Sequence, residues 1–258
     1  KNSEVEDEKF YDTIYKIQKH KQIETITPYV SSTVLISSYN NLNAVKLTGI
    51  EPKMAEKSYG IFRNLKRGSL DFINSPDDAY IYGKKQENEY YIKIKQKEYD
   101  TNKKLNEAEK KELLEEINLL KTEVITPPSQ KLTCIYLGRA LSESLTLKVG
   151  DSLKLMTPFG DIGPMGMMPK SKKFRICGIF FTSLYEFDQY NIYMPINEAK
   201  KFLGISQISG VEIKIKDIYK SDKLVKYIEK KIDLNSFKVA GFSQLNKNLF
   251  SALQVEKF

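Results

Sequence analysis

The chain has 258 residues, 41% of them hydrophobic and 11% aromatic, so it can bury the core of one large domain or two modest ones. Its net charge of +8 comes almost entirely from lysine, because arginine occurs only at Arg63, Arg67, Arg139 and Arg175. Nucleic-acid recognition favours arginine forks and a dense basic stripe. Neither is present, and no recognition motif is visible, so nucleic acid is not an expected partner.

The first 65 residues predict alternating helices and strands. Phe10, Ile14 and Ile17 follow helical spacing over residues 6–19. A run rich in Thr, Val, Ile and Ser predicts a strand over 23–38, and the turn at 40–43 lets residues 44–49 pair back as a hairpin strand. After Pro52, residues 54–65 predict a helix that ends near Gly68.

The middle of the chain is the most highly charged part. Residues 80–82 and 90–94 predict strands separated by a polar turn. Residues 101–121 are the most charged stretch, and within it Asn106 is a good N-cap for a predicted helix. The apolar stripe of this helix is narrow: Leu113, Ile117 and Leu120. Its charges balance internally, which favours a solvated helix docked lightly on the body over a partner-binding helix. The prolines at 127 and 128 predict an exit hinge.

The remaining elements return to a mixed pattern. Strands are predicted at 132–136, 153–156, 174–181, 211–215 and 237–240, and helices at 138–145, 197–203 and after Ser221. The last strand-helix-strand unit mirrors the helix-strand start of the chain. We therefore expect the two ends to form one α+β subdomain, with the middle inserted into it.

The segment from Met156 to Pro169 is the most unusual part of the sequence. It places three of the six methionines within four positions, among prolines and glycines. Proline removes backbone donors, so the segment is predicted to project as an irregular arm between two strands. For an average loop, burial of the methionines in the core is the more common outcome. The proline-bounded setting favours instead an exposed, adaptable apolar tip for recognition.

Few residues offer chemistry. Cys134 and Cys177 both fall on predicted strands and can pair, but two cysteines do not make a disulfide framework, so buried thiols are the favoured interpretation. His20, the one histidine, closes a lysine-rich helix end. No metal-ligand set, catalytic triad, phosphate-binding loop, nucleophile elbow or dinucleotide fingerprint is present. The expectation is a non-catalytic protein without cofactor or metal.

The ends of the sequence suggest a fragment of a longer protein. The chain starts at Lys1 rather than methionine, and the helical pattern over 246–258 has no glycine or proline stop. No apolar run reaches the roughly 18 residues that a membrane span needs.

Seven short pieces of sequence occur in a characteristic order. They are Pro28-Tyr29-Val30, Gly49-Ile50-Glu51-Pro52, Leu137-Gly138-Arg139-Ala140-Leu141, Leu147-Lys148-Val149-Gly150-Asp151, Tyr185-Glu186-Phe187-Asp188, Gly210-Val211-Glu212 and Leu249-Phe250-Ser251-Ala252-Leu253.

This ordered set resembles the periplasmic domain of lipoprotein-releasing ABC-transporter permeases of the LolC/LolE type, within the wider MacB-like group. The resemblance implies an α+β fold with a Porter-like subdomain (1–52 and 209–242) and an inserted, strand-rich Sabre-like subdomain (53–208). The resemblance does not cover residues of about 82–130, which would be a charged insertion atypical of the family. The helix at 243–258 would lead to a membrane span, with this domain in the periplasm and the permease in the bacterial inner membrane.

The resemblance also implies a binding site and partners. LolC-like members carry a hairpin arm, the Hook, that grips a LolA-like periplasmic chaperone, and its Pro-Met-Gly is matched by Pro164, Met165 and Gly166. The implied partners are that chaperone, a lipoprotein substrate, a LolD-like ATPase subunit that hydrolyses ATP, and a second permease subunit. The expected chaperone-binding residues are Pro158, Ile162, Pro164, Met165, Gly166, Met167, Met168 and Pro169 of the arm, with the Pad residues Lys154, Ser171 and Lys172 beside it. Met167 and Met168 are included for their chemistry alone.

Two alternatives stay open. A MacB-like efflux permease or an FtsX-like cell-division permease would share the fold, and residues 158–169 would then pack flat on the body. A stand-alone extracytoplasmic binding module would lack membrane spans beside the domain.

Overall fold

The computed structural model describes residues 14–38, 41–157, 162–163, 166–167, 169–232, 238–241 and 244. Contacts divide the chain into two units, which are described separately. The first unit comprises residues 1–29 and 207–258, and the second comprises residues 30–206. The subdomain boundaries that the sequence suggested remain a prediction.

Six strands of the main sheet close into a ring and so form a barrel. The neighbours follow the order β1, β2, β9, β4, β8, β5 and back to β1, because β5 pairs with both β8 and β1. The pairs β2–β9 and β4–β8 are parallel, whereas β4–β9, β5–β8 and β1–β5 are antiparallel. This mixed sheet, together with the helices, confirms the predicted α+β class. The ring strands are β1 (Ile23–Ser38), β2 (Asn41–Ile50), β4 (Thr133–Gly138), β5 (Ser152–Thr157), β8 (Lys170–Phe180) and β9 (Asn191–Pro195).

The core lies inside this ring and beneath the helices that cover it. Residues 134–138 and 174–180 are all buried, so β4 and β8 are covered on both faces. A strand with two covered faces needs a nearly continuous apolar run instead of an alternating one, and these two segments supply it except at the buried Arg175. The helices that pack on the ring are α5 (Arg139–Ser144), α6 (Tyr185–Tyr190) and α7 (Ile196–Leu203).

The two cysteines form a disulfide, so the favoured interpretation of buried thiols was wrong. Cys134 on β4 and Cys177 on β8 have Cα atoms 5.4 Å apart, within the range that a disulfide needs. Both residues are fully buried. Because the two strands are neighbours in the sheet, the pairing of β4 with β8 brings the sulfurs together. A single sequence does not reveal which strands will be neighbours.

The region after β2 is more broken than the predicted helix over 54–65. It consists of α2 (Pro52–Ser58), the 3-10 helix η1 (Gly60–Asn64), the short strand β3 (Leu65–Gly68) on the far side of β8, and the 3-10 helix η2 (Asp71–Ile73). The break falls at Tyr59, which is extended and buried beside Phe62 and Tyr193.

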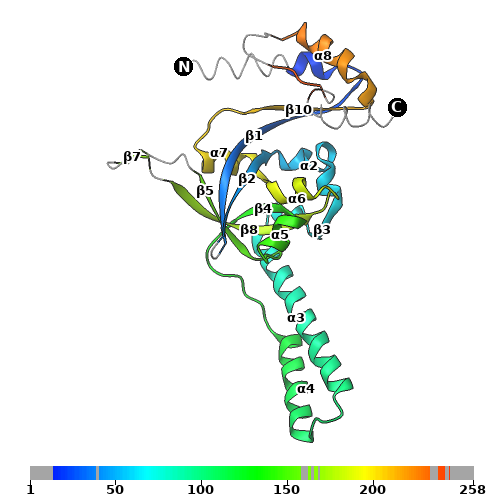
Figure 1. The fold of residues 1–258 in the computed structure, drawn as a ribbon, viewed down its shortest axis with the longest axis vertical. Coiled ribbons are helices and arrows are strands. Elements are labelled where there is room, and N and C mark those ends of the chain that lie inside the picture. The colour runs from blue at the N-terminus through cyan, green and yellow to red at the C-terminus, as the bar shows by residue number, and fades with distance from the viewer. Residues whose placement is uncertain are drawn as a thin grey trace, which may run out of the picture. The chain divides into compact units, whose positions relative to one another are not determined.

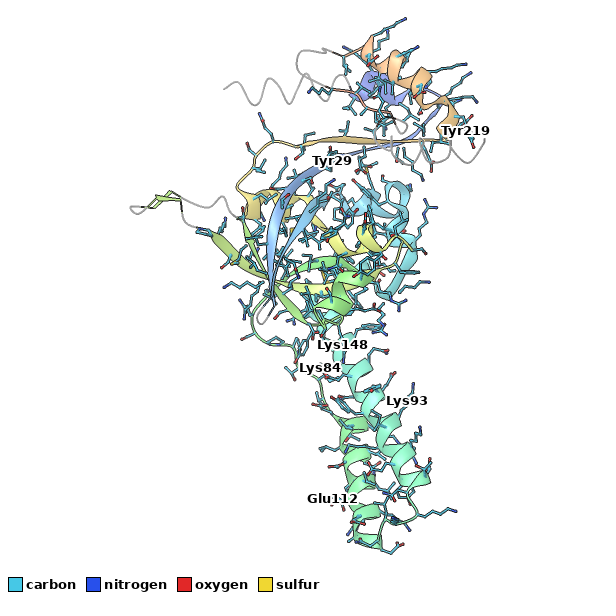
Figure 2. All side chains as sticks on the ribbon, viewed as in Figure 1. Tyr29, Lys84, Lys93, Glu112, Lys148 and Tyr219 are labelled. Atoms are coloured by element: carbon cyan, nitrogen blue, oxygen red, sulfur yellow. A yellow bond between two sulfur atoms is a disulfide. The ribbon has the colours of Figure 1, made fainter. Side chains whose placement is uncertain are left out.

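A long helical hairpin leaves the second unit between β3 and β4 (Figure 1). Helix α3 (Pro76–Thr101) replaces the predicted strands at 80–82 and 90–94, so those two predictions were wrong. Helix α4 (Glu107–Thr122) confirms the later prediction, and Asn106 caps it through a reciprocal capping box with Glu109. Lys93 and Glu112 are exposed and point away from the hairpin on opposite sides (Figure 2).

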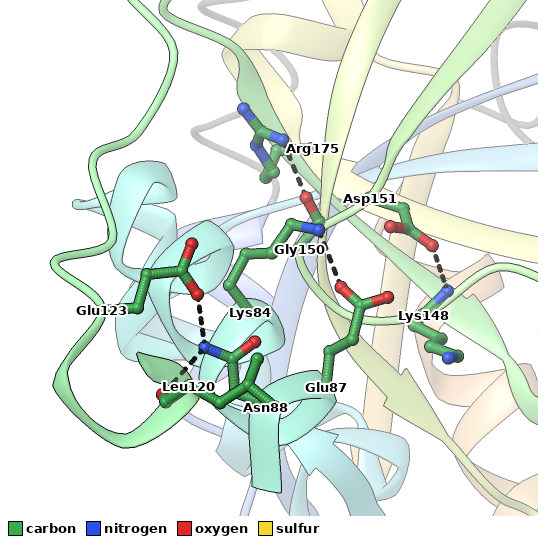
Figure 3. Close-up of polar contacts among 9 residues, drawn as sticks. All are labelled: Lys84, Glu87, Asn88, Leu120, Glu123, Lys148, Gly150, Asp151 and Arg175. Carbon is green, nitrogen blue, oxygen red and sulfur yellow. Dashed lines mark hydrogen bonds and ion pairs between the residues drawn. The ribbon is translucent and has the colours of Figure 1, made fainter. Parts of the chain in front are cut away.

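The two helices of the hairpin contact each other through few groups. Ile117 of α4 is 1% exposed, and Lys95 on α3 forms an ion pair with Glu116 on α4. Near the root, the Asn88 side chain donates to Glu123 Oε2 at 2.7 Å and to the Leu120 carbonyl at 3.4 Å (Figure 3). These contacts hold α4 against α3 at a distance from the barrel.

The N-terminal half of α3 packs against the turn that precedes β5. A Cβ atom added at Gly83 would lie 2.0 Å from the Val149 carbonyl oxygen, so helix and turn meet backbone to backbone. The Arg175 guanidinium donates to the Gly150 carbonyl at 2.7 Å and lies 4.9 Å from the Tyr80 ring centroid (Figure 3). Burial lowers the pKa of Arg175, and Asp77, Tyr80 and Asp151 oppose that effect. The hairpin is thus built onto the barrel.

The first unit has a small core of its own. It is formed by helical residues 14–18, the start of β1, strand β10 (Gly210–Ile215) and helix α8 (Ser221–Glu229). The 3-10 helix η3 (Ile218–Lys220) precedes α8 and has no buried residue. β10 pairs antiparallel with residues 23–29 of β1. The buried residues are Ile17, Ile23, Ile26, Leu224 and Ile228. The strand predicted at 237–240 is not formed at residues 238–240, and residue 237 lies outside the described residues.

Within the described part of the chain, no helix is both long enough and apolar enough to span a membrane.

Candidate docking site at the arm

The segment between β5 and β8 contains a small β-hairpin. Strands β6 (Ile162–Gly163) and β7 (Gly166–Met167) pair antiparallel, with Ile162 opposite Met167 and Gly163 opposite Gly166. The Gly163–Gly166 pair flanks positions 164 and 165 in the sequence, and Gly166 is the third residue of the Pro-Met-Gly match. Pro158, Pro164, Met165 and Met168 lie outside the described residues, and Pro169 is exposed.

The root of the arm is the antiparallel ladder between β5 and β8. It runs from Ser152 opposite Arg175 to Thr157 opposite Lys170. Residues directly opposite each other share a face of the sheet, and successive residues alternate between faces. Lys154 therefore shares its face with Lys173, which lies directly opposite, and with Ser171 two positions away. All three are exposed.

The six ladder positions on this face include three basic residues and no carboxylate. They are Ser152, Lys154, Met156, Ser171, Lys173 and Arg175. Two lysines directly opposite each other on an antiparallel pair repel, which is locally unfavourable. An anionic group placed over them relieves that repulsion, so the arrangement suits an acidic partner.

Lys172 lies on the other face of the ladder, opposite Leu155. Its ammonium is 3.3 Å from Glu198 Oε2 on α7 and 5.4 Å from the Phe174 ring centroid. The structure thus brings Lys154 and Ser171 together but not Lys172. Lys173, which the sequence interpretation did not include, takes the place beside Lys154. Strand parity, counted from buried Phe174, could have pointed to it.

Glu198 is the centre of a small polar cluster behind the arm. Its carboxylate accepts from Lys201 Nζ at 2.9 Å, Lys172 Nζ at 3.3 Å and the Thr133 hydroxyl at 3.1 Å. The hydrogen bond from Lys201 is the largest cause of a lowered pKa for Glu198, burial opposes it, and Lys172 adds to it. The carboxylate therefore stays ionised at neutral pH.

The described residues contain no group of three or more His, Cys, Asp or Glu side chains placed to hold a metal ion.

Comparison with known proteins gives relatives by sequence. No family model matches the chain. It is 27% identical over 124 residues to the lipoprotein-releasing system transmembrane protein LolC of Neisseria meningitidis serogroup B, a match that covers 48% of this chain and 30% of the relative. The LolC protein of Xylella fastidiosa strain 9a5c is 26% identical over 123 residues, with the same coverage.

Over about half of its length, the sequence is similar to LolC proteins. This confirms the resemblance that the seven ordered pieces suggested. The LolC-like match spans about half of this chain and less than a third of the length of the curated relatives.

Two solved structures with weak overall likeness belong to transporter proteins. One is the extracellular domain of the noncanonic ABC-type transporter YknZ from Gram-positive bacteria, with 10% identity, TM-score 0.41 and coverage of 87% of this chain and 82% of that chain. The other is the periplasmic region of MacB from Actinobacillus actinomycetemcomitans, with 13% identity, TM-score 0.39 and coverage of 85% and 72%.

Proposed function

We propose that this chain is the periplasmic domain of an inner-membrane ABC-transporter permease that releases lipoproteins to a soluble, LolA-like carrier. The observation that carries the proposal is the LolC-like sequence, which covers 48% of the chain. The buried disulfide supports an oxidising compartment outside the cytoplasm. The domain is non-catalytic in this proposal. A separate LolD-like ATPase subunit hydrolyses ATP, and a second permease subunit completes the transporter.

The carrier binds at the arm, through residues 158–169, and at its root. The methionines of the arm offer flexible, polarizable side chains that adapt to an apolar surface. Lys154 and Lys173 supply the charge beside it, and Ser171 a hydroxyl. Charges at such a rim steer the encounter and set its orientation, whereas the apolar contacts supply most of the affinity.

The handoff has to be reversible, because each lipoprotein must leave with its carrier. An interface below about 1,200 Å² is typical of transient encounters and suits a short arm with a small root surface. The acyl chains of the cargo move from one apolar surface to another, since each methylene left in water costs about 0.8 kcal/mol.

The test is site-specific photo-crosslinking in the intact transporter. A photoreactive side chain at Met165 is expected to give an adduct with the carrier, and one at Tyr219, which is 94% exposed in the first unit, is the control position. Met165→Asp and the double change Lys154→Glu/Lys173→Glu are expected to reduce lipoprotein release. Lys121→Glu, an exposed change on α4, is the matched control.

No carrier adduct at Met165, together with normal lipoprotein release by Met165→Asp, would overturn the proposal. Adducts only with the second permease subunit would favour an efflux or cell-division permease instead.

A further inference from the structure

Glu198 joins three elements behind the arm. It lies on α7, accepts from Thr133 at the start of β4, and pairs with Lys172 near the free end of β8. Its own helix contributes Lys201, one turn later. A second contact runs parallel to these, because the Lys170 ammonium donates to the Lys201 carbonyl at 3.1 Å. Lys170 and Lys172, which lie on the same face of β8, are therefore both bound to α7.

On β8 the apolar packing beneath this cluster begins at Phe174, whereas on β5 the facing residues Leu153 and Leu155 are buried. The Phe174 and Phe202 rings meet edge to face with centroids 5.3 Å apart, and both residues are buried. From Lys170 to Lys173 every residue of β8 is exposed or half-buried. The core thus fixes β8 from Phe174 onward, and the four residues before it are held by β5 and by the contacts with α7.

We propose that Glu198 is a positioning residue that fixes the direction of the Lys170–Lys173 end of β8. On one edge this strand end pairs with β5, whose residues 154–156 pair in turn with β1. On the other edge the pairing of β8 with β4 starts only at Phe174, so the contacts with α7 hold the residues before it. The carboxylate of Glu198, itself oriented by Thr133 of β4, ties this strand end to the body of the barrel. The strand end leads into the arm, so the consequence for carrier docking rests on the proposed function.

The geometry separates this role from a direct contact. Lys172 and Glu198 lie on the face opposite Lys154 and Lys173, so they do not share the basic surface. The Glu198 side chain is 23% exposed and that of Lys172 is 42% exposed, which leaves the pair partly accessible and less strongly coupled than a buried one. A partner that touches the basic face is affected by Glu198 only through the direction of the strand.

Amide hydrogen exchange of the 258-residue chain tests the inference. Glu198→Gln keeps a carbonyl that can accept from Thr133 but removes the charge. It is expected to speed exchange at residues 170–173 about fivefold, the factor that corresponds to about 1 kcal/mol for a partly exposed ion pair. Exchange at residues 176–180 is expected to stay unchanged. The control is Glu143→Gln, which removes an ion pair with Arg139 elsewhere on the barrel.

A charge swap provides the rescue. Lys172→Glu alone is expected to loosen residues 170–173, and Lys172→Glu combined with Glu198→Lys is expected to return exchange to within twofold of the wild type. Unchanged exchange in Glu198→Gln, or failure of the swap in a variant whose residues 176–180 remain protected, overturns the inference. Loosening spread equally over 170–180 also overturns it, because that pattern marks general destabilisation.

Carrier binding separates this inference from the proposed function. Weaker carrier binding by Glu198→Gln, restored by the swap, supports both. If exchange at 170–173 rises but neither wild type nor variant binds the carrier, the positioning role stands and the proposed function fails.

Discussion

The close contact between α3 and the turn before β5 predicts that replacing a helical glycine by alanine destabilises the protein. Helix propensity alone would predict the opposite effect. Gly83 lies within α3, where replacement of glycine by alanine normally stabilises a helix by about 1 kcal/mol. Here the added Cβ would lie 2.0 Å from the Val149 carbonyl oxygen and 3.1 Å from the Gly150 Cα. Backbone atoms cannot rotate away as a flexible side chain can, so the helix or the turn has to move.

The turn resists that movement because hydrogen bonds hold it on both sides. The Gly150 N–H donates to the Ile176 carbonyl at 2.8 Å, and the Gly150 carbonyl accepts from Arg175 at 2.7 Å. Loss of one such bond costs about 1 kcal/mol, and overpacking costs about 1–3 kcal/mol. Set against the gain in propensity, Gly83→Ala is expected to destabilise the protein by about 1–3 kcal/mol.

Thermal unfolding followed by circular dichroism measures this effect. For a chain of this size, about 2–4 °C of Tm corresponds to 1 kcal/mol, so a fall of about 2–12 °C is expected. Gly60→Ala is the matched control, because its added Cβ meets nothing within 4 Å. A Gly83→Ala protein with a higher Tm than the wild type would refute the close seating of α3 on the turn.

Three further predictions concern the disulfide, the Glu198 cluster and the cap of α4. The Cys134–Cys177 bond spans a sequence separation of 43 residues. Loop closure of that length gives about 4 kcal/mol, so the double alanine variant should lose up to that in urea unfolding and no longer respond to reductant. Glu198 has a depressed folded-state pKa, so its stabilising contribution is present above its ordinary value of 4.5 and is lost as pH falls through the lower folded value. Acid should therefore speed exchange at residues 170–173 relative to Glu198→Gln, whose exchange should show no such step; equal pH profiles would contradict this. Asn106→Ala should cost about 1 kcal/mol and fray the first turn of α4 in hydrogen exchange, whereas an Asn118→Ala control should not.

Local signals in the sequence predicted much of the fold. The strand predicted at 23–38 has the same bounds as β1, because the segment is long and rich in Thr, Val, Ile and Ser in spite of Pro28. The capping box at Asn106 needs only residues within one turn, so it was also visible. In contrast, Tyr90, Tyr91 and Ile94 have high β propensity, and the strand prediction followed from it. They are helical because α3 runs unbroken from its contact with the turn before β5 to its contacts with α4. This is a tertiary effect.

Features that depend on distant segments could not be predicted. Closure of the ring requires β5 to pair with β1, about a hundred positions earlier in the chain, and no local pattern encodes that. The disulfide follows from the adjacency of β4 and β8, which is equally non-local. At the root of the arm, the sequence suggested basic and polar residues, but the face on which each lysine lies depends on register. That is why Lys172 was grouped with Lys154 and Lys173 was missed.

The buried disulfide also constrains how the protein is made. The segment between Cys134 and Cys177 includes β5 and the whole arm, so the bond closes a loop around them. Both sulfurs are inaccessible in the folded barrel, and an oxidant or a disulfide-forming enzyme cannot reach them there. Oxidation must therefore occur while β4 and β8 are still coming together. After that point the finished protein is kinetically protected, because a reductant can act only after the barrel opens.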